Sequence, residues 1–173
     1  MKLFLQLIAL LITSNAFSQP KWQASIGPQI NIPIGDFRGV KTGYGGGLEV
    51  AKLLNNTGAV TAAVGFNTFP TKNGVSLQSD LGFITTRIGY RSTCTLGRIY
   101  GAADLGIAFF TQDFTKTTGF SYSIGPGYLL KVGNNSFVDL GARFNFNSRK
   151  IDKKQFNWVA IRAAFGLNFG GKK

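Results

Sequence analysis

The sequence predicts an all-β protein: an eight-stranded antiparallel up-and-down transmembrane β-barrel with a plugged polar lumen, preceded by a signal peptide. After residue 18 the apolar residues alternate with polar ones, and no segment keeps helical spacing over three turns. Eight such segments occur, each long enough to cross a bilayer as a tilted strand of roughly 9–11 residues. Charged residues make up only 15% of a chain whose formal net charge is +12. The exterior of the folded protein therefore needs few charges.

The first 18 residues have the pattern of a secretory signal peptide. Lys2 supplies the positive start, and residues 3–12 form an apolar run. Ala16 and Ser18 fit a small-x-small cleavage site. The apolar run is too short to span a bilayer, which takes roughly 20 apolar residues. A buried N-terminal helix is the alternative interpretation, but Pro20 and a strand-like pattern follow at once.

Residues 19–173 are expected to form one outer-membrane barrel domain. The predicted strands lie at about 22–34, 42–53, 58–69, 80–91, 98–110, 118–131, 136–147 and 156–169. Three of the connections are short turns, at 54–57, 92–97 and 132–135, and four are longer loops, at 35–41, 70–79, 111–117 and 148–155. Short turns at one end and long loops at the other are typical of outer-membrane barrels, whose short turns lie in the periplasm.

The two faces of each strand differ in polarity. In the seventh predicted strand, one face carries Val138, Leu140, Ala142, Phe144 and Phe146, and the other carries Asp139, Gly141, Arg143, Asn145 and Asn147. A soluble barrel has an apolar interior and a polar exterior. Here the small, amide and charged face suits a lumen, and the larger apolar face suits lipid.

Strand parity places a set of ionisable residues inside the barrel: Glu49, Arg87, Arg91, Asp104, Lys131, Asp139, Arg143 and Arg162. Eight strands enclose a space about wide enough for side chains alone. Because an unpaired buried charge is costly, we expect an arginine–carboxylate network that plugs the lumen and leaves no open channel.

Aromatic residues are expected at the two membrane interfaces. Those near the loop ends are Tyr44, Phe66, Phe120, Tyr122, Phe144 and Phe146, and those near the turn ends are Trp22, Tyr90, Tyr128 and Phe169. Five large residues fall on the lumen parity instead: Leu81, Phe83, Phe110, Leu129 and Trp158. Bulges, or positions above the bilayer, are the interpretations that the sequence offers for them.

The chain resembles the small outer-membrane β-barrel domain family of Bacteroidota, which is also called PorT-like. The resemblance rests on residues 25–37, read SIGPQINIPIGDF, on residues 43–49, read GYGGGLE, and on residues 120–130 with their Ser-Ile-Gly-Pro-Gly-Tyr. It covers the whole of residues 19–173 and is a similarity of pattern. It implies no shared catalytic residues, and it implies an accessory role in secretion or assembly machines for some members.

The chain has no histidine. Activation of a serine hydroxyl needs a base poised near neutral pH, and histidine is the usual one. The remaining candidates are the lumen carboxylates, which are better explained as partners of the arginines. The usual metal ligands are absent or single, and the glycine run at 43–47 lacks the Gly-Lys-Ser/Thr of a phosphate loop. We therefore predict no catalytic site, no metal and no cofactor.

The fourth predicted loop is strongly basic. It contains Arg149, Lys150, Lys153 and Lys154, and Lys72 and Lys116 add to the positive charge of the same rim. Such a rim is either a solvated surface or a contact for lipopolysaccharide phosphates or an acidic partner. Export argues against nucleic acid as the partner. Cys94, the single cysteine, is expected to be an incidental free thiol.

The leading functional hypothesis is a non-catalytic barrel in the outer membrane, in contact with its lipid and lipopolysaccharide. It would be a structural or accessory subunit of a larger secretion or assembly complex. Two alternatives remain: a barrel enzyme that modifies lipid, against which the lack of histidine counts, and a soluble periplasmic barrel that binds a small apolar ligand. The second alternative requires an apolar interior, which the strand parity does not give.

Overall fold

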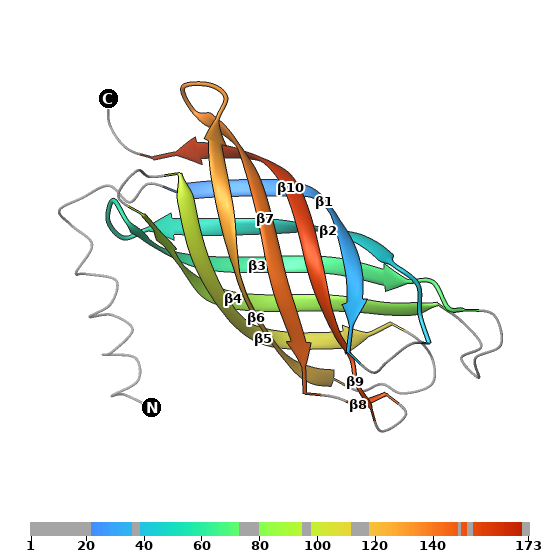
Figure 1. Cartoon of the computed structure of the whole chain (residues 1–173). Helices are drawn as coiled ribbons and strands as arrows, with labels where there is room; N and C mark the ends of the chain where they lie inside the picture. The colour runs from blue at the N-terminus through green and yellow to red at the C-terminus, as the bar shows by residue number, and fades with distance from the viewer. Residues whose placement is uncertain are drawn as a thin grey trace, which may run out of the picture.

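The computed structural model of the chain is a closed antiparallel β-barrel (Figure 1). It describes residues 22–35, 39–72, 80–94, 98–111, 118–148, 150–151 and 154–170. The barrel strands are β1 (Trp22–Ile34), β2 (Gly43–Leu53), β3 (Gly58–Phe69), β4 (Leu81–Thr93), β5 (Ile99–Phe110), β6 (Thr118–Lys131), β7 (Ser136–Asn147) and β10 (Asn157–Phe169). The predicted signal peptide lies outside the described residues.

Each barrel strand pairs with its neighbours in sequence, and β1 pairs with β10 to close the ring. In Figure 1 the strands are strongly tilted as they wind round the barrel, as closure of a sheet requires. A closed barrel has no free strand edge, and hydrocarbon would not tolerate one. No helix in the described part of the chain is long and apolar enough to cross a membrane.

One small element was missed by the sequence interpretation. β8 (Lys150–Ile151) and β9 (Lys154–Gln155) form a two-stranded antiparallel hairpin within the fourth predicted loop. It lies at the same end of the barrel as the last residue of β7 (Figure 1). Two-residue strands are too short for alternation of polar and apolar residues to reveal them.

Side-chain burial follows the predicted parity. Ile26, Ile88, Leu105 and Ile124 point outward with 57–68% of their surface exposed, whereas polar residues on the opposite parity, such as Ser25, Asn67, Asp104 and Asp139, are buried. The exterior of the barrel is thus apolar over much of its height. This is the reverse of a soluble barrel, and it suits immersion in lipid.

Glycine lets the strands curve tightly around a crowded interior. A Cβ at Gly127 would lie 2.1 Å from Cζ of Tyr100, its cross-strand partner. Only a glycine leaves room there for the Tyr100 ring, which folds inward over β6. An aromatic side chain covering a cross-strand glycine is a recurrent device for curved sheets.

Candidate functional site

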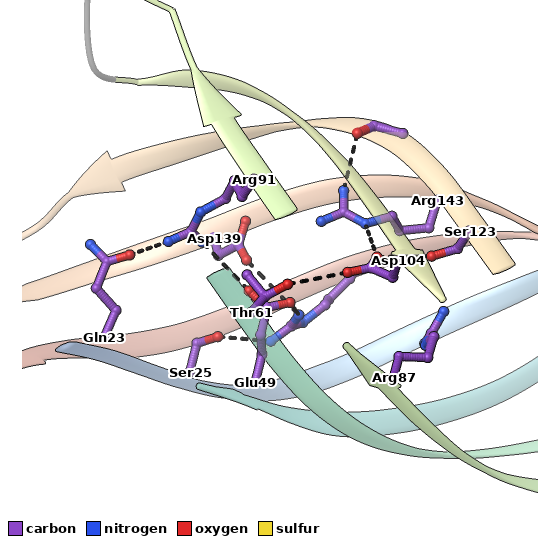
Figure 2. Close-up of polar contacts among 12 residues, drawn as sticks. Gln23, Ser25, Glu49, Thr61, Arg87, Arg91, Asp104, Ser123, Asp139 and Arg143 are labelled. Atoms are coloured by element: carbon purple, nitrogen blue, oxygen red, sulfur yellow. Dashed lines mark hydrogen bonds and ion pairs between the residues drawn. The ribbon is translucent and has the colours of Figure 1, made fainter. Parts of the chain in front are cut away.

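The charged residues described in the lumen come from five of the eight barrel strands and meet inside the barrel (Figure 2). Glu49 on β2 accepts Arg91 of β4 at 3.5 Å and Arg162 of β10 at 3.0 Å, one on each carboxylate oxygen. All three side chains are nearly inaccessible to solvent. Glu49 therefore connects three strands, no two of which are neighbours in the sheet.

Neutral side chains also accept hydrogen bonds from these two arginines. Arg162 Nη2 donates to Ser25 Oγ at 2.8 Å, and Arg91 Nη2 donates to Gln23 Oε1. Arg162 also lies 4.0 Å from Asp139 Oδ2. Hydrogen bonds of this kind are what make a buried ion pair tolerable, because they replace the water that each charge has lost.

A second centre forms around Asp104 on β5. Its carboxylate lies 3.6 Å from Arg143 Nε and accepts hydrogen bonds from Ser123 Oγ at 2.9 Å and Thr61 Oγ1 at 3.3 Å. Figure 2 shows these three side chains converging on Asp104 from separate strands. The serine and threonine hydroxyls here are donors to an already paired carboxylate.

Tyr100 links the two centres. Its hydroxyl donates to Asp139 Oδ1 at 2.5 Å. The guanidinium carbons of Arg91 and Arg143 each lie 5.3 Å from the centroid of its ring, within cation–π range. Tyr100 was not among the predicted network residues. Two features of the sequence could have indicated it: Tyr100 has the lumen parity, and its strand is next to the strand of Arg91. A search restricted to charged partners overlooks an aromatic residue.

Lys131 is a correction to the predicted network. It has the lumen parity, but it is the last residue of β6, and its side chain is exposed. Among the described residues it forms no ion pair. Parity gives the side of a strand and not the depth in the barrel, so a residue at a strand end can face the mouth instead of the lumen.

Four of the five large residues of lumen parity pack together in one apolar cluster. Leu81, Phe83 and Trp158 are buried and belong to an apolar cluster, and Phe110 packs against it. The other members of the cluster are Val40, Phe69, Phe156 and Ala160. This set, which we call the aromatic plug, lies inside the barrel towards the loop end. Leu129 is half-buried near the turn end of β6.

The rings of the aromatic plug pack tightly. Phe83 stacks on Phe156 and Trp158 at centroid distances of 5.6 and 5.8 Å, and Phe69 meets all three edge-on. The pairing of β3 with β4 runs without a break from Gly58 to Phe69. Bulges are therefore the wrong explanation for Leu81 and Phe83. The lumen is polar in its middle and apolar towards its loop end, so its polarity is less uniform than predicted.

A layer of amides separates the aromatic plug from the charges. Asn31 Nδ2 and Gln29 Nε2 both donate to Asn67 Oδ1, and Asn145 lies beside Arg87, whose Nη1 donates to its Oδ1 at 2.6 Å. A cavity among the charges measures about 40 Å³. A water molecule needs about 10–15 Å³ on this measure, so this cavity has room for only a few water-sized particles.

Much of the predicted basic rim lies outside the described part of the chain. Lys116, Arg149 and Lys153 belong to undescribed residues, and only the backbone is described for Lys150 and Lys154. Lys72 is exposed. Cys94 is an exposed free cysteine at the turn end of β4. No group of three or more metal-binding side chains comes together among the residues that the structure describes.

The comparisons with known proteins rest on structure. No family model matches the chain, and no curated protein does so either. Ail, the attachment invasion locus protein of Yersinia pestis, superposes with a TM-score of 0.57 at 16% identity, covering 87% of this chain and 99% of Ail. Neisserial surface protein A gives 0.54 at 15%, covering 87% and 97%. The outer membrane protein AlkL gives 0.58 at 11%, covering 91% and 94%.

The chain has the fold of the small outer-membrane β-barrels. The likeness gives the fold, and the apolar exterior of the barrel agrees with it. The narrower resemblance to the barrels of Bacteroidota finds no test in these neighbours and stays a prediction.

Proposed function

We propose that this barrel is a non-catalytic structural or accessory subunit of a larger complex in the outer membrane. The observation that carries the proposal is the filled lumen. Arg162, Glu49 and Arg91 span its middle, and the aromatic plug fills it towards the loop end. A barrel whose lumen is filled can bind a partner only through its lipid-facing exterior and its loops.

The lipid-facing wall offers a place for a membrane partner. A groove of about 960 Å³ crosses the exterior from β2 to β5 over β1, β10, β7 and β6. It is lined by small or flat residues, namely Pro28, Pro126, Ala142 and Ala163, and by the larger residues Ile30, Tyr44, Ile99, Tyr128, Leu140 and Ile161. Small residues let the backbone of a transmembrane partner approach closely, and close packing drives association within a bilayer.

The test is an affinity pull-down of the tagged barrel from native outer membranes in mild detergent, with mass-spectrometric identification. A stoichiometric membrane protein is the expected result. Ala163→Trp fills the groove and should release this partner. Ala103→Trp is the matched control, because Ala103 is also an exposed alanine, on β5, outside the residues that line the groove. Recovery of the barrel alone from native membranes would contradict the proposal.

A second proposed role is contact with polyanions at the loop end. The observation that favours it is the basic rim, together with the fact that Ail was solved in complex with the heparin analogue sucrose octasulfate. Clustered cations attract phosphates or sulfates. Replacing Arg149, Lys150, Lys153 and Lys154 by glutamine should weaken binding to immobilised lipopolysaccharide. Replacing Arg98 and Lys131, which are exposed at the turn end, by glutamine should leave this binding unchanged. Equal binding by the two variants would contradict this role.

A further inference from the structure

The charges of the lumen do not balance. Its described part contains four buried or half-buried arginines and three carboxylates: Arg87, Arg91, Arg143 and Arg162 against Glu49, Asp104 and Asp139. Every carboxylate in this set faces at least one arginine within 4.0 Å. One positive charge is therefore left over in a space from which most water is excluded.

The surplus charge is on Arg87. Its guanidinium forms no ion pair with any carboxylate of the described residues. It donates to the neutral Asn145 Oδ1 at 2.6 Å, and that amide is itself engaged, because its Nδ2 donates to the Arg143 carbonyl at 3.0 Å. An amide oxygen satisfies one donor but does not neutralise the charge, so the electrostatic cost of burial persists.

The surplus charge faces a cavity. Arg87, Arg143 and Arg162 all line the same space of about 40 Å³, and Glu49 and Asp104 line it too. The cavity thus has three positive and two negative neighbours. Arg162 Nε is buried without a hydrogen-bond partner among the described residues. A cavity with net positive charge and an unmet donor favours an anion over neutral water.

We propose that this cavity binds one small monovalent anion, with a halide as the simplest occupant. Chloride and bromide are close to water in size, and they accept hydrogen bonds from several directions at once. The volume has room for about three water-sized particles on the scale of 10–15 Å³ each, which excludes lipid headgroups and nucleotides. The anion neutralises the fourth arginine and completes the lumen network.

The first test uses the wild-type protein. Crystals grown in sodium bromide should show an anomalous peak in the cavity between Arg87, Arg143 and Arg162. If the cavity shows no anomalous peak and contains water alone, the proposal is overturned. This measurement does not depend on whether any variant folds.

The second test measures stability. An anion that binds only the folded barrel raises its stability by mass action. In mild detergent, replacing sodium gluconate by sodium chloride at equal ionic strength should raise the unfolding midpoint by about 3–6 °C in a chain of this length, when chloride is present at about ten times its dissociation constant. Gluconate serves as the comparison because it is too large for the cavity.

The variants locate the effect. Arg87→Gln removes the surplus charge and should abolish the difference between chloride and gluconate, while the barrel still shows heat modifiability on gels. Arg98→Gln removes an exposed arginine at the turn end and should keep the full difference. An equal chloride effect in wild type, Arg87→Gln and Arg98→Gln would mean that the ion acts on the surface, and the proposal would fail.

Discussion

Glu49 is the residue on which most of the lumen network converges. It accepts two arginines, from β4 and β10, which lie two strands away on either side of β2, and only 6% of its surface is exposed. Glu49→Gln would keep the shape of the side chain and remove its charge. Two guanidiniums would then share a neutral acceptor, and removal of one partner of a buried pair costs about 3–5 kcal/mol. Urea unfolding in detergent or vesicles should show that loss.

Asp80→Asn is the matched control for this prediction. Asp80 is exposed at the loop end and accepts a backbone hydrogen bond from Thr71 at 3.1 Å. Surface substitutions of this kind stay within about 0.5 kcal/mol. If both variants unfolded at the same urea concentration as the wild type, the network would contribute nothing measurable to stability.

The pairing of residues in the lumen was beyond the reach of the sequence. Parity placed Arg91 and Arg162 on the inside, and the structure confirms this. It did not show that both would meet Glu49, because strand tilt and register set the depth of each side chain, and neither is encoded in alternation. The same lack of depth information made Lys131 look like a member of the network.

The strands themselves were predictable. The predicted bounds of β1, β3, β6 and β7 agree with the structure, and those of the other barrel strands differ by one or two residues. Long strands with one apolar and one polar face give a strong period-two signal. The aromatic plug was predicted only as a set of exceptions, since residues on three strands and in two connecting segments are brought together by barrel closure.

The outward faces of the strands lead to a prediction about depth. Ile88 lies near the middle of β4 with 68% of its surface exposed, and Val132 follows the end of β6 with 50% exposed. A charge on the lipid face costs about 2–4 kcal/mol at the bilayer midplane and about 0–1 near the interface. Ile88→Arg should therefore destabilise the folded barrel in lipid vesicles far more than Val132→Arg does.

The comparison of these two variants also tests immersion in the membrane. In a soluble barrel, an exposed arginine is harmless at either position, because water solvates it. Equal unfolding free energies for Ile88→Arg and Val132→Arg in vesicles would contradict the lipid-facing assignment of β4. Measurement of both in detergent alongside vesicles separates the effect of bilayer depth from any local packing defect.

At the scale of the whole molecule, two different kinds of side chain, charged and aromatic, fill the lumen. The ion pairs lie in its middle, and the aromatic plug lies towards the loop end, with amides such as Asn67 and Asn145 between them. The two sets of side chains support each other. The buried charges need partners, and the closely packed rings of the aromatic plug exclude the water that would weaken the ion pairs. The lumen of the barrel is thus filled by side chains, apart from the small cavity among the charges.

A barrel whose lumen is filled by side chains should not conduct ions. Wild-type protein inserted in a planar bilayer is expected to give no discrete current steps, whereas a reference porin under the same conditions does. Truncation of the plug by Phe83→Ala with Trp158→Ala removes its stacked pair but leaves the Glu49 network beneath, so this variant should also fail to conduct. Steps in the wild type would show that the lumen opens. Steps in the plug variant alone would show that the aromatic plug, and not the ion pairs, forms the seal.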